Sequence, residues 1–203
     1  MIKLLSSNNP ALVRISLWAL VALSRGQLAK IGEMTTYGIL PLVIKYIISP
    51  LPPYQVDILV QALWLLVNIL TGSGARILPQ ISELGLLNHI GSILLVPNLQ
   101  SEILLPLIKV LNFVASAEDS FMFTVLSHEP RINVALLELM QQHRSSPMML
   151  RELIYLLSNI AAGARSVSSH LVKTPHLVEF LISLMTESSS PFELKKEVIN
   201  FRF

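Results

Sequence analysis

The polar and hydrophobic positions of this chain predict a series of short apolar helices. The stretch QALWLLVNILTGSGA is almost entirely apolar, yet it carries Trp64 and, four residues later, Asn68. The stretch RELIYLLSNIAAGA carries Tyr155 and Asn159 at the same spacing. Because a helix turns once in about 3.6 residues, the two members of each pair lie on one helical face. We therefore expect two similar helices that present an aromatic ring beside an amide.

The same pattern returns along the chain as an internal repeat. Five stretches align on one position, at steps of 44 to 47 residues. The aligned positions are Trp18, Trp64, Ile108, Tyr155 and Asn200. Each of the first four is followed by a second apolar segment, and these expected helices cover residues 37–47, 84–94, 129–140 and 174–185. A period of about 40–47 residues with two or three helices per unit is typical of armadillo and HEAT-type solenoids.

Breaks between the helices indicate the boundaries within each unit. A small residue eight positions after the aligned position is expected to end the long helix, at Gly26, Gly72, Ser116 and Gly163. Shorter helical turns are expected at residues 75–84 and 165–173. Proline- and serine-rich stretches recur at one position in every unit, so they indicate turns within a repeat and not linkers between domains.

The expected fold is all-α, a right-handed superhelix of about four to five armadillo repeats that forms a single array over residues 1–203. The sequence begins in the tail of a second helix and ends inside a long helix, so partial repeats are expected at both ends. A repeat stack without polar capping repeats exposes apolar end faces. We expect these uncapped ends to favour self-association.

The composition agrees with stacked, buried helices. Hydrophobic residues make up 52% of the chain and charged residues 14%, and the mean hydropathy is +0.61. The longest run without charge lies between Asp57 and Arg76, but its last third holds glycine, serine and threonine. We therefore expect no membrane span, because stacking of neighbouring repeats gives apolar helices a place in a protein core.

Composition also narrows the classes of function. The chain has no cysteine and its five histidines are scattered, so neither a disulfide nor a metal site is expected. No glycine-rich phosphate loop or catalytic constellation stands out, so we expect neither an enzyme nor a cofactor. A net charge of +2 without a basic stripe argues against nucleic acid as a partner. The N-terminal segment lacks the features of a signal peptide, so a soluble, intracellular protein is expected.

Three asparagines share one position in successive units, at Asn68, Asn112 and Asn159. In a solenoid the long helices line a concave groove, where an amide can pair with the N–H and C=O groups of an extended peptide. Neighbouring aromatic rings would form walls for the aliphatic part of a lysine or arginine, with a cation–π contribution. The alternative is that the aromatic residues fill the core and the asparagines cap helices. Repetition of the asparagine in one register favours the groove.

Several segments of the repeat match the pattern of one known family. The segments are LWALVALSRGQ, DILVQALWLLVNILTGSG, SEILLPLIKVLNFVASAEDS, LLSNIAAGARS and FELKKEV. They resemble importin-α, the armadillo-repeat adaptor that binds nuclear localisation signals, and the resemblance covers almost the whole sequence. In that alignment the chain spans the middle and C-terminal repeats. It departs from the family at Ala22, Ile108 and Asn200, which replace an asparagine, an arginine and a tryptophan.

The resemblance implies a function and a set of binding residues. The implied peptide-binding positions are Trp18, Trp64, Asn68, Asn112, Tyr155 and Asn159, and the implied acidic groove residues are Asp57, Glu118, Glu152 and Glu197. The implied partners are basic, Lys/Arg-rich cargo peptides, with importin-β or an export factor bound through regions outside this chain. The implied location is the cytoplasm and nucleus. The alternative is a divergent armadillo scaffold that joins protein partners without binding signals.

Overall fold

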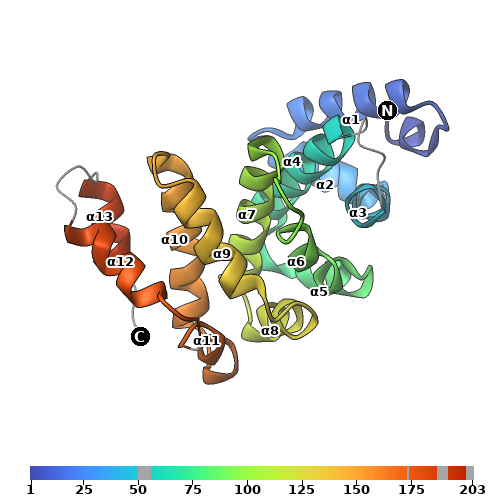
Figure 1. Ribbon diagram of the computed structural model, residues 1–203. Coiled ribbons are helices and arrows are strands. Elements are labelled where there is room, and N and C mark those ends of the chain that lie inside the picture. Colours follow the sequence, from blue (N-terminus) through green and yellow to red (C-terminus); the bar gives the residue numbers. More distant parts are fainter. Residues whose placement is uncertain (50–55, 173, 187–191, 200–203) are drawn as a thin grey trace. The chain divides into compact units, whose positions relative to one another are not determined.

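All the regular elements of the described structure are helices. The computed structural model describes residues 1–49, 56–172, 174–186 and 192–199. Within these ranges there are α-helices and short 3-10 helices but no strand (Figure 1). The all-α prediction is therefore confirmed.

Contacts within the chain divide it into two compact units, which we describe separately. Unit 1 comprises residues 1–90 and 99–110, and unit 2 comprises residues 91–98 and 111–203. Helix α7 (Ser101–Ala115) contributes its first part to unit 1 and its last part to unit 2. The single array over residues 1–203 stays a prediction.

Unit 1 is built around α4 (Val56–Ser73). This helix packs against α1 (Pro10–Ser24), α2 (Leu28–Thr36) and α3 (Ile39–Ile48). The shared core includes Leu17, Leu63 and Leu66, whose side chains are fully buried. The other elements of unit 1 are η1 (Ile2–Ser6), η3 (Gly74–Ile77), α5 (Leu78–Glu83) and η4 (Leu86–Asn88).

Unit 2 is built around α10 (Pro147–Ala162). This helix packs against α9 (Ile132–Gln142), α11 (Arg165–Val172) and α13 (Phe192–Ile199). The remaining elements are α6 (Ile90–Ile93), which begins at the last residue of the first segment of unit 1, α8 (Asp119–His128) and α12 (Leu177–Thr186). Leu153, Leu156 and Leu157 are buried on α10 and lie on one face of it, which packs against the other helices.

The predicted series of long and second helices is present. Helices α1, α4, α7, α10 and α13 cover the five aligned stretches as far as these are described, although Asn200 lies outside the described residues. Helices α3, α9 and α12 lie at three of the four predicted second helices. The prediction of one helix over residues 84–94 was wrong, because the segment is broken into η4 and α6. Gly85 has a left-handed φ of 80°, which interrupts the helix between α5 and η4.

Small residues end three of the long helices as predicted, but Gly72 does not. α1 ends two residues before Gly26, while α7 and α10 end directly before Ser116 and Gly163. In contrast, α4 continues through Gly72 to Ser73. A Cβ atom on Gly72 would lie 2.5 Å from Cδ1 of Ile31 on α2, which is closer than real Cβ contacts. The glycine therefore serves the close approach of α2 to α4 and not the end of α4.

One helical stretch has the length and composition of a membrane span. Val56–Glu83 contains a window with a mean hydropathy of 1.7, and the sharply bent pair α2 and α3 passes the same test when taken together. Core helices of soluble proteins pass this test too, and α4 packs against α1, α2 and α3. Packing within unit 1 therefore accounts for the apolar character of α4, and the expectation of no membrane span stays a prediction.

Polar contacts join residues that lie about one repeat apart. The side-chain amide of Asn133 on α9 donates to the carbonyl of His170 on α11 at 2.6 Å. The backbone N–H of Ala164 donates to Oδ2 of Asp119 on α8 at 3.0 Å. Each of these contacts satisfies a polar group near the helices that it joins, which favours one packing arrangement within unit 2.

Candidate functional site

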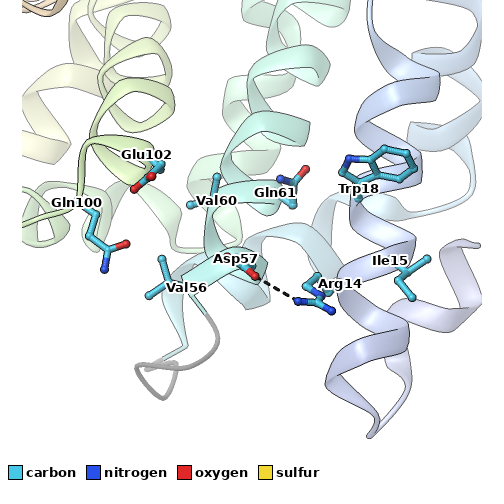
Figure 2. Close-up of a pocket in the computed structure, with 9 residues that line it drawn as sticks. All are labelled: Arg14, Ile15, Trp18, Val56, Asp57, Val60, Gln61, Gln100 and Glu102. Atoms are coloured by element: carbon cyan, nitrogen blue, oxygen red, sulfur yellow. Dashed lines mark hydrogen bonds and ion pairs between the residues drawn. The ribbon is translucent and has the colours of Figure 1, made fainter.

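Unit 1 contains a cavity of about 380 Å³ between its long helices. It is lined by Arg14, Ile15, Trp18, Val56, Asp57, Val60, Gln61, Gln100 and Glu102. In Figure 2, Asp57 and Gln61 of α4 point towards α1, whereas Val56 and Val60 point towards the start of α7. The cavity therefore combines two of the predicted site residues, Trp18 and Asp57, with acidic and amide side chains from neighbouring elements.

The sequence of α1 explains why Trp18 faces solvent. Asn9 caps the helix by accepting a hydrogen bond from the N–H of Ala11, and Pro10 occupies the first helical position. Leu17 and the buried residues around it use one face of α1 for the core. Trp18 lies on the other side and is 63% exposed. An indole this exposed offers a large apolar surface to a ligand.

The cavity carries both signs of charge. Nη1 of Arg14 lies 3.4 Å from Oδ2 of Asp57, and Figure 2 shows this contact between α1 and α4. Arg14 precedes Trp18 by one helical turn, so the two side chains occupy the same side of α1. The sequence alone did not single out Arg14, although its i,i+4 spacing from the aromatic position was a signal that could have done so.

Glu102 is a second cavity residue that the sequence analysis missed. It lies in the first turn of α7 and is exposed, and within the described residues it has no hydrogen-bond or ion-pair partner. Pro106 lies inside α7 and has no N–H to donate to the carbonyl of Glu102, four residues earlier. The carboxylate of Glu102 is the hydrogen-bond acceptor at this end of the cavity. An exposed carboxylate suits a cationic donor.

Trp64 and Asn68 lie on α4 but are not part of this cavity. Both are half-buried. Nδ2 of Asn68 donates to the carbonyl of Val21 at 3.2 Å and to Oγ of Ser24 at 2.9 Å. The amide N–H groups of Asn68 thus join α4 to the end of α1, and its Oδ1 is the atom left to accept a bond from a ligand.

In unit 2, Asn112 and Glu152 contact each other. Asn112 is only 7% exposed, and its Nδ2 lies 3.3 Å from the carbonyl and 3.5 Å from Oε2 of Glu152. Its Oδ1 is buried and has no hydrogen-bond partner among the described residues. An unpaired buried acceptor costs free energy unless a donor from outside the chain satisfies it.

The other predicted residues of α10 lie close to this contact along the helix. Tyr155 is three residues after Glu152 and has an exposed ring. Asn159 follows one turn later, and its Nδ2 is buried without a partner in the part of the chain that is described. Glu197 lies on α13, but its side chain is outside the described residues. Unit 2 therefore brings together Asn112, Glu152, Tyr155 and Asn159 on α7 and α10, with an unpaired amide atom at each asparagine.

Two neighbouring acids at the start of α8 behave differently. Glu118 is the exposed residue before the helix and makes no side-chain capping bond. Asp119 accepts the N–H of Ala164, and a Cβ atom on Gly163 would lie 2.7 Å from its Oδ1. Glu118 is the acid predicted for the groove, whereas no role was predicted for Asp119. The structure shows that Asp119 holds the turn between α10 and α11.

Tyr46 is a half-buried titratable residue of unit 1. Burial raises the pKa of Tyr46, whose hydroxyl donates to the carbonyl of Leu5. This tyrosine joins α3 to η1 and is not part of the cavity. Among the described residues, no group of three or more His, Cys, Asp or Glu side chains is arranged to hold a metal ion.

Comparison with known proteins identifies the fold. No protein-family model matches the chain, and no curated protein matches it. Among solved structures, a designed armadillo repeat protein in complex with the peptide (KR)4 matches 98% of this chain and 77% of its own, with a TM-score of 0.79 and 18% identity. The chain has the armadillo-repeat fold.

Two further solved structures agree with this armadillo fold. A computationally designed armadillo repeat protein for modular peptide recognition has a TM-score of 0.80 and 17% identity, over 98% of this chain and 78% of its own. An engineered protein has a TM-score of 0.78 and 21% identity, over 98% of this chain and 75% of its own. At these identities the likeness shows the fold alone. The resemblance to importin-α therefore stays a prediction.

Proposed function

We propose that this armadillo-repeat chain is an importin-α-like adaptor that binds basic nuclear localisation signals in extended conformation, and that it acts in the cytoplasm and nucleus. The observation that carries the proposal is the unit 1 cavity, where exposed Trp18 lies with the acids Asp57 and Glu102. An aromatic surface and carboxylates together suit the aliphatic stem and the charged end of lysine or arginine. The complex between a designed armadillo protein and (KR)4 supports this chemistry for the fold.

Unit 2 supports the same proposal through backbone recognition. Asn112 has an unpaired buried oxygen and Asn159 an unpaired buried nitrogen. An extended peptide carries both N–H donors and C=O acceptors, and it could pair with these amides once their side chains turn outwards, since neither atom is accessible to solvent in the described structure. Glu152 and the exposed ring of Tyr155 would then contact a basic side chain of the same peptide.

The second candidate function is an armadillo scaffold that joins protein partners without binding basic signals. It is favoured by three contacts that already use predicted ligand groups, because Asn68 bonds to α1, Asp57 pairs with Arg14, and Asn112 faces Glu152. Asp57 and Glu102 also lie in the first turns of their helices, where a carboxylate is favourable without any ligand. Neither candidate involves catalysis by this chain.

Fluorescence anisotropy of a labelled bipartite Lys/Arg-rich peptide, titrated with the protein at low and moderate salt, tests the proposal. We expect saturable binding that weakens as salt rises. Trp18→Ala should weaken it by about three- to thirtyfold if the indole contacts the peptide. Tyr37→Ala removes an aromatic residue that is 74% exposed but outside the cavity, so it serves as the matched control.

The outcomes separate the two candidate functions. Loss of binding in Trp18→Ala but not in Tyr37→Ala supports signal recognition in the unit 1 cavity. No binding by the folded wild-type chain at either salt concentration excludes the adaptor and leaves the scaffold. Circular dichroism on each variant checks that helix content is retained.

A further inference from the structure

The acid at the centre of the unit 1 cavity already contacts a cation of this chain. Asp57 lies 3.4 Å from the guanidinium of Arg14, and their side chains are 67% and 54% exposed. A guanidinium in that position satisfies the carboxylate as a lysine or arginine of a ligand would. A basic ligand at Asp57 therefore either competes with Arg14 for Oδ2 or binds Oδ1 beside the guanidinium charge.

Arg14 also opposes basic ligands by its own charge. It comes from the same side of α1 as Trp18, and both line the cavity. If a ligand took Asp57, the guanidinium would be left beside the ligand cation without its present partner. Like charges in contact at a partly exposed site destabilise a complex, and the effect is local because salt screens it beyond about 8–10 Å.

Glu102 provides the remaining acid of the cavity. Within the described residues it pairs with no cation, and it lies beside Val60 and Gln100, on the side of α4 away from Arg14 (Figure 2). One ammonium or guanidinium group can therefore be bound at this end without displacing a group of the protein.

We infer that Arg14 sets the specificity of the unit 1 cavity, so that it admits one basic side chain at Glu102 and disfavours a second basic side chain at Asp57. The inference rests on the proposed function and names the ligand class of this cavity more closely. The preferred peptide carries an isolated lysine or arginine with neutral residues beside it. A peptide that is basic at every position gains little from Asp57 while Arg14 pairs with that acid.

Anisotropy with two labelled octapeptides, (Lys-Arg)4 and (Lys-Ser-Ser-Ser)2, tests the inference at moderate salt. Arg14→Gln should raise the affinity for (Lys-Arg)4 by about three- to tenfold, and the affinity for (Lys-Ser-Ser-Ser)2 by less than about twofold. Glu102→Gln should lower the affinity for both peptides by about three- to tenfold. In the Arg14→Gln background, Asp57→Asn should remove the gain in affinity for (Lys-Arg)4.

Two controls separate the role of Arg14 from a change in net charge or folding. Arg25→Gln removes the same charge from an exposed position at the end of α1, outside the cavity, and should change either affinity by less than about twofold. Arg14→Lys keeps the charge and should retain the wild-type preference. Circular dichroism of each variant should match the wild type, because both Arg14 and Arg25 are exposed.

Failure of this inference is distinct from failure of the proposed function. If (Lys-Arg)4 binds the wild type but Arg14→Gln and Arg25→Gln have equal effects, the role of Arg14 is overturned and the adaptor stands. The role of Arg14 is also overturned if Asp57→Asn leaves the gain of Arg14→Gln unchanged in the double variant. If neither peptide binds the wild type or Arg14→Gln, the proposed function fails and this inference fails with it.

Discussion

The side-chain amide of Asn68 on α4 donates to the carbonyl of Val21 on α1 at 3.2 Å, and also to Oγ of Ser24 at 2.9 Å. Ser24 is fully buried and itself donates to the carbonyl of Val21. The three groups form a small network at the end of α1, where helix carbonyls lack intrahelical partners. Asn68, chosen from the sequence as a peptide-binding residue, thus joins two long helices of unit 1.

Replacing Asn68 with alanine should destabilise unit 1. The loss of two hydrogen bonds to partly buried groups should cost about 1–2 kcal/mol, offset in part by the higher helix propensity of alanine. The midpoint of urea unfolding, followed by circular dichroism, measures the change. Ser24→Ala should be non-additive with Asn68→Ala because both remove the same bond.

Asn8→Ala provides the matched control, since Asn8 is exposed and lies before α1. It should leave the midpoint unchanged within about 0.5 kcal/mol. An unchanged midpoint in Asn68→Ala, together with lost peptide binding, would show instead that the amide serves the ligand.

Gly72→Ala should destabilise the contact between α2 and α4. The new Cβ would lie 2.5 Å from Cδ1 of Ile31, so the side chain or the helix must shift. Overpacking of this kind costs about 1–3 kcal/mol, which exceeds the gain of about 1 kcal/mol from helix propensity at most sites. Ile31→Val removes the Cδ1 atom and should recover part of the loss in the double variant, as measured by thermal unfolding.

Gly32→Ala is the control for Gly72→Ala on the same pair of helices. Gly32 lies inside α2 with helical geometry, and a Cβ there meets no atom within 4 Å. The substitution should stabilise the protein by about 0.5–1 kcal/mol. Equal effects of the two substitutions would contradict the packing role given to Gly72.

Asp119→Ala should loosen the turn between α10 and α11. It removes the acceptor of the Ala164 N–H, and this exposed amide would then bond to water, so the loss should be about 0.5–1.5 kcal/mol. Native-state hydrogen exchange at Ala164 should report faster exchange. Glu118→Ala removes the neighbouring carboxylate, which makes no capping bond, and should leave that exchange rate unchanged.

Tyr46 should make stability depend on pH in the alkaline range. Burial raises its pKa above the usual 10.0, so the folded state favours the neutral phenol more than the unfolded state does. The contribution is fully present below pH 10, and it is lost as pH rises from 10 through the raised folded pKa. Tyr46→Phe should lower stability by about 0.5–1.5 kcal/mol at neutral pH through the lost bond to Leu5.

The difference between wild type and Tyr46→Phe should then shrink above pH 10. Urea unfolding of both proteins at pH 8, 10 and 11 measures this difference in the free energy of unfolding. The two chains have the same lysines, so effects of lysine cancel in the difference. A constant difference across the three pH values would contradict the raised pKa.

Much of the fold was predictable because the same pattern of apolar positions recurs in each repeat, so a helix that is uncertain in one repeat is supported by the others. The aligned aromatic positions located α1, α4 and α10 correctly, since each helix shows the same apolar period. The break between η4 and α6 at His89 was missed, because the apolar residues on both sides of it fit one continuous helix. Gly72 was misread as a helix end because its role depends on Ile31, forty-one residues earlier, which no local pattern shows.

Less of the candidate site was predictable. Trp18 and Asp57 were chosen from the sequence, and both line the cavity. Arg14 and Glu102 were missed, because the repeat pattern points to acids in one register and to aromatic–amide pairs. The hydrogen-bond partner of an amide such as Asn68 depends on contacts between repeats. These contacts join residues that are close in space but far apart in the sequence, so no local pattern shows them.

The polar contacts between neighbouring repeats also limit how the chain can be rearranged. Asn68 meets Ser24 at the end of a long helix, Asp119 meets a backbone N–H beyond α10, and Asn133 meets the carbonyl of His170. Each contact uses a different donor and acceptor, so the junction between α1 and α4 differs from the one between the helices α8–α10 and α11. Transposing or duplicating one repeat would leave a donor or acceptor without its counterpart. Unlike an array assembled from identical modules, this chain encodes the order of its repeats. Consensus engineering of it would have to keep the donor and the acceptor of each contact together.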